Sequence, residues 1–381
     1  MKIGIVLTNP PQPSETFLNS LITVLSREHE VILFLSEKSK KYTNLSQLTY
    51  LNKQNIIKNS FFYGIKFLFN LKKFNRLKKF TQLKQLLHDF PIWSEANLDY
   101  LHFAFGNLAF GRENYAEIMG CKMSISFRGS DINVYPQWHN LKYNDILEKC
   151  TKIHCNSQML KLKVLCHNNH IHSKIYVIPP GLQAEFNLNT MDIELLNQKR
   201  LKNNLVKIVS VGRLHWIKGF EQVLEALGKL KKEGVNFEYC IIGQGPEEEK
   251  LVFLSHFYGI QRNVKFLGLM KTSEIRQQLE RANLYVQTSW AEGFSNSTME
   301  AQAIGLPAIV TPISGMKELI FHEETGYIAA SHSSNDILQG FKWYFSLSED
   351  AKMILAKKAN QKVKDNFSMD QLNQNWMSFF N

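Results

Sequence analysis

The chain has 381 residues, of which 44% are hydrophobic and 21% charged, and its formal net charge is +11. This length favours two domains over one, and the composition is that of a globular protein rather than a disordered one. No stretch reaches the roughly 18 apolar residues of a membrane-spanning helix, and the opening MKIGIVLTNPP is too short an apolar run for a signal peptide. Five scattered cysteines argue against a disulfide framework, so we expect reduced thiols and a cytoplasmic location.

Short apolar runs rich in β-branched residues alternate with longer helical patterns along the whole chain. Because several runs are continuously apolar, they predict strands buried on both faces, as in parallel sheets covered by helices. The predicted strands are 2–8, 30–36, 99–105, 122–129, 152–157, 174–181, 206–212, 237–243, 263–268, 284–289 and 307–311. The segments between them are long enough for crossover helices, for example residues 220–234.

The strand series restarts near residue 205, after a polar, Asn-rich segment. We therefore predict an α/β protein with two Rossmann-like domains that face each other across a cleft. The expected domains are residues 1–180 and 205–365, joined by a linker at 181–204. A C-terminal helix at 366–381 is expected to return to the first domain.

The net positive charge lies in the first half of the chain. Residues 1–175 carry 23 basic and 12 acidic side chains, so the remainder, with 22 of each, is neutral. Eight of the basic residues lie in 58–90, with no acidic residue before Asp89 and with phenylalanines interleaved. Read as a helix, this segment has a Phe/Leu stripe and a basic face, which favours binding to an anionic bilayer; a domain helix with a solvated face is the alternative. No nucleic-acid module accompanies the charge.

His102 lies near the end of the third predicted strand, where α/β sheets place ligand-contacting groups, although a lone histidine in apolar surroundings is often a core residue. The residues CHNNHIH at 166–172, with Cys150 and Cys155 upstream, resemble a zinc site. An extended stretch from 150 to 155 would hold the two thiols about 16 Å apart, so we expect no metal. Asp-x-Asp, which would hold a diphosphate through a divalent cation, is absent from the sequence.

The second half contains three strand-to-helix turns with polar residues suited to a phosphorylated ligand. Arg213 and Lys218, five residues apart, could clamp a diphosphate, or could be two surface cations. Gly243 follows another strand, where backbone could border a base. In EGFSNSTME, small polar residues suit a helix N-cap that offers free N–H groups to phosphate, and Glu300 lies about one turn inside. The candidate residues in this last segment are Glu292, Gly293, Phe294, Ser295, Asn296 and Glu300.

The segments VGRLHWIKG, IIGQGPEEEKL, VKFLG, EGFSNSTMEAQAIGLPAIVT and GMKELI occur in this order and closely resemble the donor-binding half of glycosyltransferase family 4. The resemblance implies the GT-B fold and a retaining transferase that uses a nucleotide-diphospho-sugar without a metal or other cofactor. It places Arg213 and Lys218 on the diphosphate, Glu300 on the ribose and Glu292 on the transferred sugar.

The first half resembles a subset of that family that builds bacterial exopolysaccharide, capsule and lipopolysaccharide-type units, through PPQPSETF, LHFAFGNLAF and SISFRGSDINVYP. On this resemblance Ser14, Glu15 and Asp131 are candidate acceptor residues, and His102, Arg128 and Glu292 are candidate catalytic residues. Arg128 replaces the histidine of a common His-Gly-x-Asp pattern and cannot transfer protons near neutral pH, but it could stabilise a phosphate or a sugar hydroxyl.

The expected function is transfer of one hexose to a saccharide acceptor at the inner face of the cytoplasmic membrane. Because the basic segment favours membrane binding, we expect this acceptor to be lipid-linked. The alternatives are a nucleotide-sugar epimerase or a phosphorylase on the same fold, or a non-catalytic basic adaptor for membrane or RNA.

Overall fold

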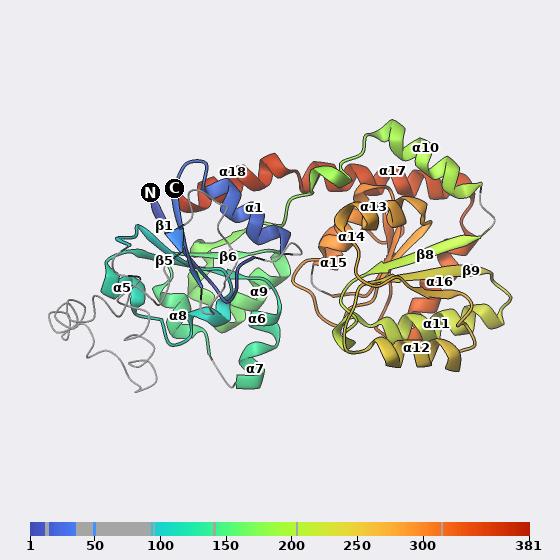
Figure 1. The fold of residues 1–381 in the computed structure, drawn as a ribbon, viewed down its shortest axis with the longest axis horizontal. Coiled ribbons are helices and arrows are strands. Elements are labelled where there is room, and N and C mark those ends of the chain that lie inside the picture. Colours follow the sequence, from blue (N-terminus) through green and yellow to red (C-terminus); the bar gives the residue numbers. More distant parts are fainter. Residues whose placement is uncertain are drawn as a thin grey trace. The chain divides into compact units, whose positions relative to one another are not determined.

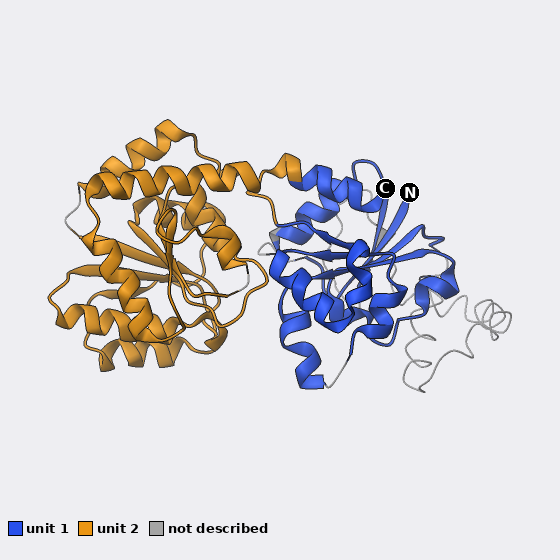
Figure 2. Cartoon of the chain, turned by 180° about the vertical axis from the view of Figure 1, so that it is seen from behind, with its two compact units in different colours: residues 1–179, 372–381 blue, residues 180–371 orange. Residues whose placement is uncertain are grey.

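The computed structural model describes residues 1–11, 15–35, 49–50, 93, 96–139, 142–202, 205–313 and 315–381. The described chain divides into two compact units, one of residues 1–179 and 372–381 and one of residues 180–371 (Figure 2). The predicted membrane-binding segment 58–90 and the candidate residue Ser14 lie outside the described residues.

The first unit is built on a seven-stranded parallel sheet with the order β3-β2-β1-β4-β5-β6-β7 (Figure 1). Its strands are β1 (Lys2–Leu7), β2 (Glu30–Leu35), β3 (Thr49–Tyr50), β4 (Tyr100–Phe103), β5 (Lys122–Phe127), β6 (Lys152–Cys155) and β7 (Ile175–Val177). Its described helices are α1 (Thr16–Leu25), α5 (Tyr115–Met119), α6 (Ser130–Asn133), α7 (Tyr135–His139), α8 (Asn144–Lys149) and α9 (Gln158–His167), with 3-10 turns at Gly106–Ala109 and Asn169–Lys174.

The second unit has a six-stranded parallel sheet with the order β10-β9-β8-β11-β12-β13. The strands are β8 (Val206–Val211), β9 (Phe237–Ile242), β10 (Val264–Phe266), β11 (Leu284–Gln287), β12 (Ala308–Val310) and β13 (Gly326–Ile328). The helices are α10 (Thr190–Leu201), α11 (Phe220–Lys232), α12 (Glu248–Phe257), α13 (Thr272–Arg281), α14 (Asn296–Ala303), α15 (Met316–Leu319), α16 (Ser334–Ser346) and α17 (Glu349–Asn366), with 3-10 turns at Ala184–Phe186 and Trp216–Lys218.

Both sheets confirm the predicted class, because each of the eleven predicted strands contains an observed parallel strand. Two observed strands, β3 and β13, were not predicted; they have two and three residues. Helices cover both faces of the second sheet. One core joins β8, β9 and β11 to α11 and α16, and the other joins the sheet to α14 and α17.

The predicted linker at 181–204 is instead part of the second unit, which begins at Pro180. Helix α10 packs against α17 and buries Ile193 and Arg200. The Arg200 guanidinium donates hydrogen bonds to the carbonyl oxygens of Leu279, Glu280, Ile304 and Gly305 at the ends of α13 and α14. The polar composition suggested a linker, but these polar groups provide hydrogen bonds at helix ends, where the last turn of carbonyl oxygens lacks intrahelical partners.

The chain ends with α18 (Met369–Phe380), and residues 372–381 belong to the first unit. Trp376, Phe379 and Phe380 pack on the first sheet, where their rings contact His102, His154 and Tyr100. The first unit is therefore completed by the last ten residues of the chain.

Candidate active site

The loops that follow β8 and β11 lie at the carboxyl edge of the second sheet. These two strands are neighbours, and the chain leaves β8 toward β9 on one side and reaches β12 from β11 on the other. Loops diverge at such a switch point, which is where open α/β sheets bind ligands. The loop after β8 carries Arg213 and Lys218, and the loop after β11 carries Glu292.

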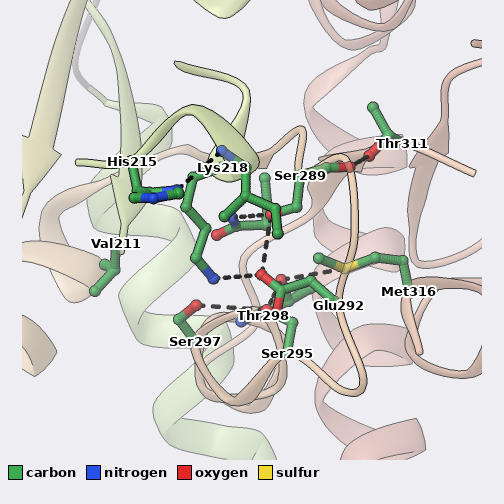
Figure 3. Close-up of polar contacts among 12 residues, drawn as sticks. Val211, His215, Lys218, Ser289, Glu292, Ser295, Ser297, Thr298, Thr311 and Met316 are labelled. Atoms are coloured by element: carbon green, nitrogen blue, oxygen red, sulfur yellow. Dashed lines mark hydrogen bonds and ion pairs between the residues drawn. The ribbon is translucent and has the colours of Figure 1, made fainter. Parts of the chain in front are cut away.

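Lys218 and Glu292 form an ion pair through Oε1 of the carboxylate (Figure 3). The two loops are held together by the backbone, since the Trp290 amide donates to the Ile217 carbonyl oxygen at 2.7 Å. Gly219 permits this approach: its φ is +67°, and an added Cβ would lie 2.1 Å from the Thr288 carbonyl oxygen. Lys218, the residue predicted to bind the diphosphate, is thus adjacent to Glu292, the residue predicted to bind the sugar, and the two side chains are paired with each other.

The N-terminus of α14 opens beside this pair. Ser295 is the N-cap residue, as predicted, and its hydroxyl accepts a hydrogen bond from the Thr298 amide at 3.3 Å (Figure 3). The eight-residue helix that follows directs its first amides and its positive dipole end outward. A cation, a carboxylate and a helix N-terminus therefore share one location, the arrangement expected for a phosphorylated ligand.

Glu300 lies in the second turn of α14 and is partly buried. Burial, reinforced by the nearby Glu185 carboxylate, raises the pKa of Glu300 to about 8. No hydrogen bond or ion pair reaches the Glu300 carboxyl group from the described residues. A buried carboxyl group with a raised pKa and no partner is typical of a ligand-binding site.

The other predicted residues of this loop have different roles. Phe294 is only 8% exposed and packs edge-to-face on Phe367, at 5.3 Å between centroids. Its side chain is therefore part of the core, whereas the expected donor contact of residues 293–297 is through their backbone amides and stays a prediction. Gly293 is buried beside Gly315, whose φ is +74°. Asn296 is the first residue of α14 and is partly exposed.

Arg213 and Gly243 lie at the same edge of the sheet. Arg213 is exposed, and its guanidinium makes no hydrogen bond or ion pair with another described residue, which leaves its donors for a ligand. Gly243 has φ +138°, and an added Cβ would lie 1.9 Å from the Gly212 carbonyl oxygen. The loops after β8 and β9 can therefore approach this closely only with glycine at 243.

In the first unit, His102 has no exposed surface. Its Nδ1 lies 2.9 Å from the Ser124 hydroxyl and its Nε2 lies 3.1 Å from the Ser126 hydroxyl. Burial, with a smaller effect of Arg128, lowers the pKa of His102 to about 3. Both nitrogens are satisfied inside the unit and the ring is neutral, so the predicted catalytic role of His102 does not fit this structure.

Arg128 follows β5, with its Nε donating to the Ala104 carbonyl oxygen at 3.1 Å and its guanidinium 4.0 Å from the Phe17 ring centroid. Burial lowers the pKa of Arg128 to about 9, opposed by Asp131 and Glu15, so the side chain is charged near neutral pH. It remains a candidate for stabilising an anionic or hydroxyl group.

Asp131 is a loop-ordering residue, not an acceptor ligand. It is 3% exposed, and its carboxylate accepts from the backbone amides of Gly106, Arg128 and Gly129. These bonds occupy the oxygens that the predicted acceptor contact would need. Glu15 directly precedes α1 and lies close enough to Arg128 to affect its pKa.

Sequence reasoning missed a row of buried polar side chains on β11 and the loop after it. Tyr285, Gln287 and Ser289 are each at most 2% exposed and are hydrogen-bonded to one another. The alternation Tyr-x-Gln-x-Ser directly before Glu292 was the available signal, because a strand places every second residue on the same face.

Neither a metal cluster nor a membrane span is present in the described part of the chain. No three His, Cys, Asp or Glu side chains gather there at metal-binding range, and no described helix is long and apolar enough to cross a bilayer. Cys150 and Cys155, the residues of the rejected zinc pattern, are buried free thiols.

Comparisons with known proteins agree with this geometry. Residues 192–362 match the model of the family described as "Glycosyl transferases group 1". The chain is 30% identical over 175 residues to the putative colanic acid biosynthesis glycosyltransferase WcaL of Escherichia coli, covering 44% of this chain and 43% of that protein. It is 28% identical over 243 residues to the amylovoran biosynthesis glycosyltransferase AmsK of Erwinia amylovora, covering 61% and 58%. The chain thus spans about half the length of the curated relatives it matches.

The solved structure of Anabaena Alr3699/HepE in complex with UDP and glucose resembles the whole chain, with a TM-score of 0.74, 18% identity, and coverage of 100% and 99%. The lipopolysaccharide outer core galactosyltransferase WaaB is similar over the same extent, with a TM-score of 0.68 and 16% identity. At these identities the likeness concerns the fold. The match to the glycosyl transferases group 1 family covers residues 192–362, less than half of the chain, and the two parallel-sheet units have the GT-B fold.

Proposed function

We propose that the protein is a glycosyltransferase that moves one sugar from a nucleotide-diphospho-sugar to a saccharide acceptor in the synthesis of a bacterial envelope polysaccharide. The family match supports a glycosyltransferase. The names of the colanic acid and amylovoran relatives support polysaccharide synthesis. The HepE structure with UDP and glucose supports a nucleotide-sugar donor.

One observation carries the proposal: the ion pair of Lys218 with Glu292 lies beside the N-terminus of α14, and Glu300 follows in the second turn of that helix, its carboxyl group making no hydrogen bond or ion pair with another described residue. A nucleotide-diphospho-sugar offers one chemical group to each of them. The diphosphate is attracted by the Lys218 ammonium and the α14 amides, the ribose hydroxyls donate to Glu300, and the sugar hydroxyls donate to Glu292.

In this scheme the protein accelerates transfer by positioning and by electrostatics. Negative charge develops on the diphosphate as its bond to the sugar breaks, and Lys218, Arg213 and the α14 amides stabilise that charge. We infer that these groups replace a divalent cation, since the sequence lacks Asp-x-Asp. The family resemblance implies that a hexose is transferred with retention of its anomeric configuration.

We infer further that the acceptor is lipid-linked and that the protein binds the inner face of the cytoplasmic membrane. The support is the surplus of positive charge in residues 1–175 and the basic, Phe-rich segment 58–90. Anionic headgroups attract such segments, with about 1 kcal/mol for each basic residue near the surface.

A thermal-shift screen of nucleoside diphosphates and their sugar conjugates tests the proposal. The chain should be stabilised by one nucleotide and more strongly by its sugar conjugate, as binding to the native state requires. Transfer to the acceptor should then persist in EDTA. Activity that disappears with EDTA and returns with Mn²⁺ would contradict the metal-free scheme, and no stabilisation by any probe would contradict the donor assignment.

A further inference from the structure

A chain of four hydrogen bonds connects the N-terminus of α14 to the Glu292 carboxylate. The Ser297 and Tyr285 hydroxyl oxygens lie 2.9 Å apart, and the Tyr285 hydroxyl lies 2.8 Å from Gln287 Oε1. Gln287 Nε2 lies 2.7 Å from Ser289 Oγ, which lies 3.0 Å from Glu292 Oε1. Ser297, Ser289 and Glu292 can be followed in Figure 3. We call these residues, Tyr285, Gln287, Ser289 and Ser297, the β11 ladder.

The ladder has one possible direction. Glu292 Oε1 is a carboxylate oxygen paired with Lys218, so it only accepts, and Ser289 must donate its single proton to it. Ser289 Oγ then accepts from the Gln287 amide nitrogen. In the reverse orientation of that amide, Gln287 Oε1 and Glu292 Oε1 would both be acceptors for the single proton of Ser289.

The same reasoning fixes the remaining two bonds. The Tyr285 hydroxyl also lies 3.4 Å from the Val211 carbonyl oxygen, but Gln287 Oε1 is closer, at 2.8 Å. Tyr285 therefore donates its only proton to Gln287 Oε1, and its oxygen accepts from Ser297. Burial raises the pKa of Tyr285 above its ordinary range, so that proton is retained. Every hydroxyl in the ladder therefore donates toward Glu292.

The ladder leaves the two oxygens of Glu292 unequal. Oε1 accepts from both the Lys218 ammonium and the Ser289 hydroxyl, whereas Oε2 makes no hydrogen bond or ion pair within the described chain. The Ser289 backbone is also anchored, because its carbonyl oxygen accepts from the Thr311 hydroxyl at 2.7 Å. A carboxylate held by one oxygen presents the other in a fixed direction.

We propose that the β11 ladder positions Glu292, so that Oε2 is presented to the hydroxyls of the transferred sugar and the sugar contact depends on the buried Gln287. This inference rests on the proposed function, and it makes Gln287 a positioning residue that touches no substrate. The ladder begins at Ser297, in the helix N-terminus assigned to the diphosphate. It therefore links the two ends of the donor site inside the protein.

The first test compares a nucleoside diphosphate with its sugar conjugate. Gln287→Leu removes both ladder bonds of the amide with little change in volume. Affinity for UDP should change little, whereas the added affinity of UDP-glucose should fall about tenfold, as expected for a lost hydrogen bond to a charged group, and kcat should fall more than KM rises. Equal losses for both ligands would overturn the inference. Tyr239→Phe is the matched control, since its buried hydroxyl bonds Ser210 outside the ladder.

The direction of the ladder has its own test in Gln287→Glu. An ionised carboxylate at 287 cannot donate, so Ser289 would turn its proton away from Glu292. Protonation of the introduced carboxyl group restores a donor there. The turnover of this variant, relative to wild type, should therefore recover as the pH falls from 8 to 5.5. A variant whose relative turnover is the same at both pH values would contradict the proposed direction.

A third test does not depend on any ligand. In a double-mutant cycle of urea unfolding, Gln287→Leu and Glu292→Gln should be non-additive, because they share the path through Ser289. The cycle of Tyr239→Phe with Glu292→Gln should be additive. If wild type binds none of the probes, the proposed function fails, and the cycle still decides the ladder: additivity of Gln287→Leu with Glu292→Gln overturns it.

Discussion

Nucleotide-sugar affinity should rise with pH because of Glu300. The pKa of Glu300 is about 8, so roughly one molecule in ten carries the carboxylate at pH 7. Ribose hydroxyls donate to the ionised form, whose two oxygens only accept. When the binding-competent form is a minor fraction, the apparent affinity is reduced by that fraction. We therefore expect affinity at pH 7 to be about tenfold weaker than at pH 9.

Stability should change in the opposite direction. An ordinary glutamate in the unfolded chain loses its proton near 4.5, whereas folded Glu300 keeps its proton to about pH 8. Folding therefore takes up a proton between these values, and the free energy of unfolding decreases as the pH rises through this window. At about 1.4 kcal/mol per pH unit the full difference is roughly 5 kcal/mol. Because Glu300 keeps some contact with water, we expect about half of that.

Calorimetry with UDP-glucose between pH 6 and 9 measures the first effect, and urea unfolding over pH 5 to 9 measures the second. Glu300→Gln should remove both dependences and should bind more weakly than wild type at pH 9, since an amide is a poorer acceptor. Glu249→Gln, at an exposed position on α12, serves as the control. The reasoning is refuted if wild-type affinity is flat over this range or if Glu300→Gln keeps the same slope.

Three further outcomes are expected. Arg213→Ala should weaken diphosphate binding by about 1.5–3 kcal/mol, the value of a charged hydrogen bond, without changing the melting temperature, because the side chain is exposed; a lowered melting temperature would indicate a structural role. His102→Ala should reduce the free energy of unfolding by about 2–4 kcal/mol, as for other buried truncations, and leave nucleotide affinity intact; calorimetry that shows weaker binding would restore a site role. Replacing the basic residues Lys72, Lys73, Arg76, Lys78 and Lys79 with Gln should release the protein from anionic vesicles, as should salt; a wild-type protein that ignores such vesicles in flotation at low salt would contradict membrane binding.

The sheets could be predicted from sequence because their central strands are continuous apolar runs, which few other structures require. Lys218, Glu292 and Ser295 could be expected at one edge of the second sheet, because strand-to-helix turns in an α/β sheet converge there. Their mutual contacts could not, since an ion pair between residues 74 apart depends on which strands are neighbours.

The errors arose where residue type did not indicate burial. His102 and Phe294 stand near predicted site positions, yet their side chains turn into cores because strand and loop geometry directs them inward. The segment 181–204 looked like a linker because it is polar. Its buried Arg200, however, donates hydrogen bonds to carbonyl oxygens at the ends of two helices. Tyr285 and Gln287 were not identified because their hydrogen-bond partners are each other and two serines, which form no known sequence motif.

The C-terminal helix also determines when each unit can finish folding during synthesis. Residues 180–371 form an uninterrupted unit, whereas the first unit needs Leu372–Asn381, whose aromatic rings cover His102, His154 and Tyr100. Until residues 372–381 leave the ribosome, the part of the first sheet around these three side chains lacks its aromatic cover. Domains usually complete folding from the N-terminus as the chain emerges; here the second unit can complete before the first. A ribosome-bound chain that lacks its last ten residues would therefore expose apolar surface on the earlier-made unit, where a chaperone would be expected to bind.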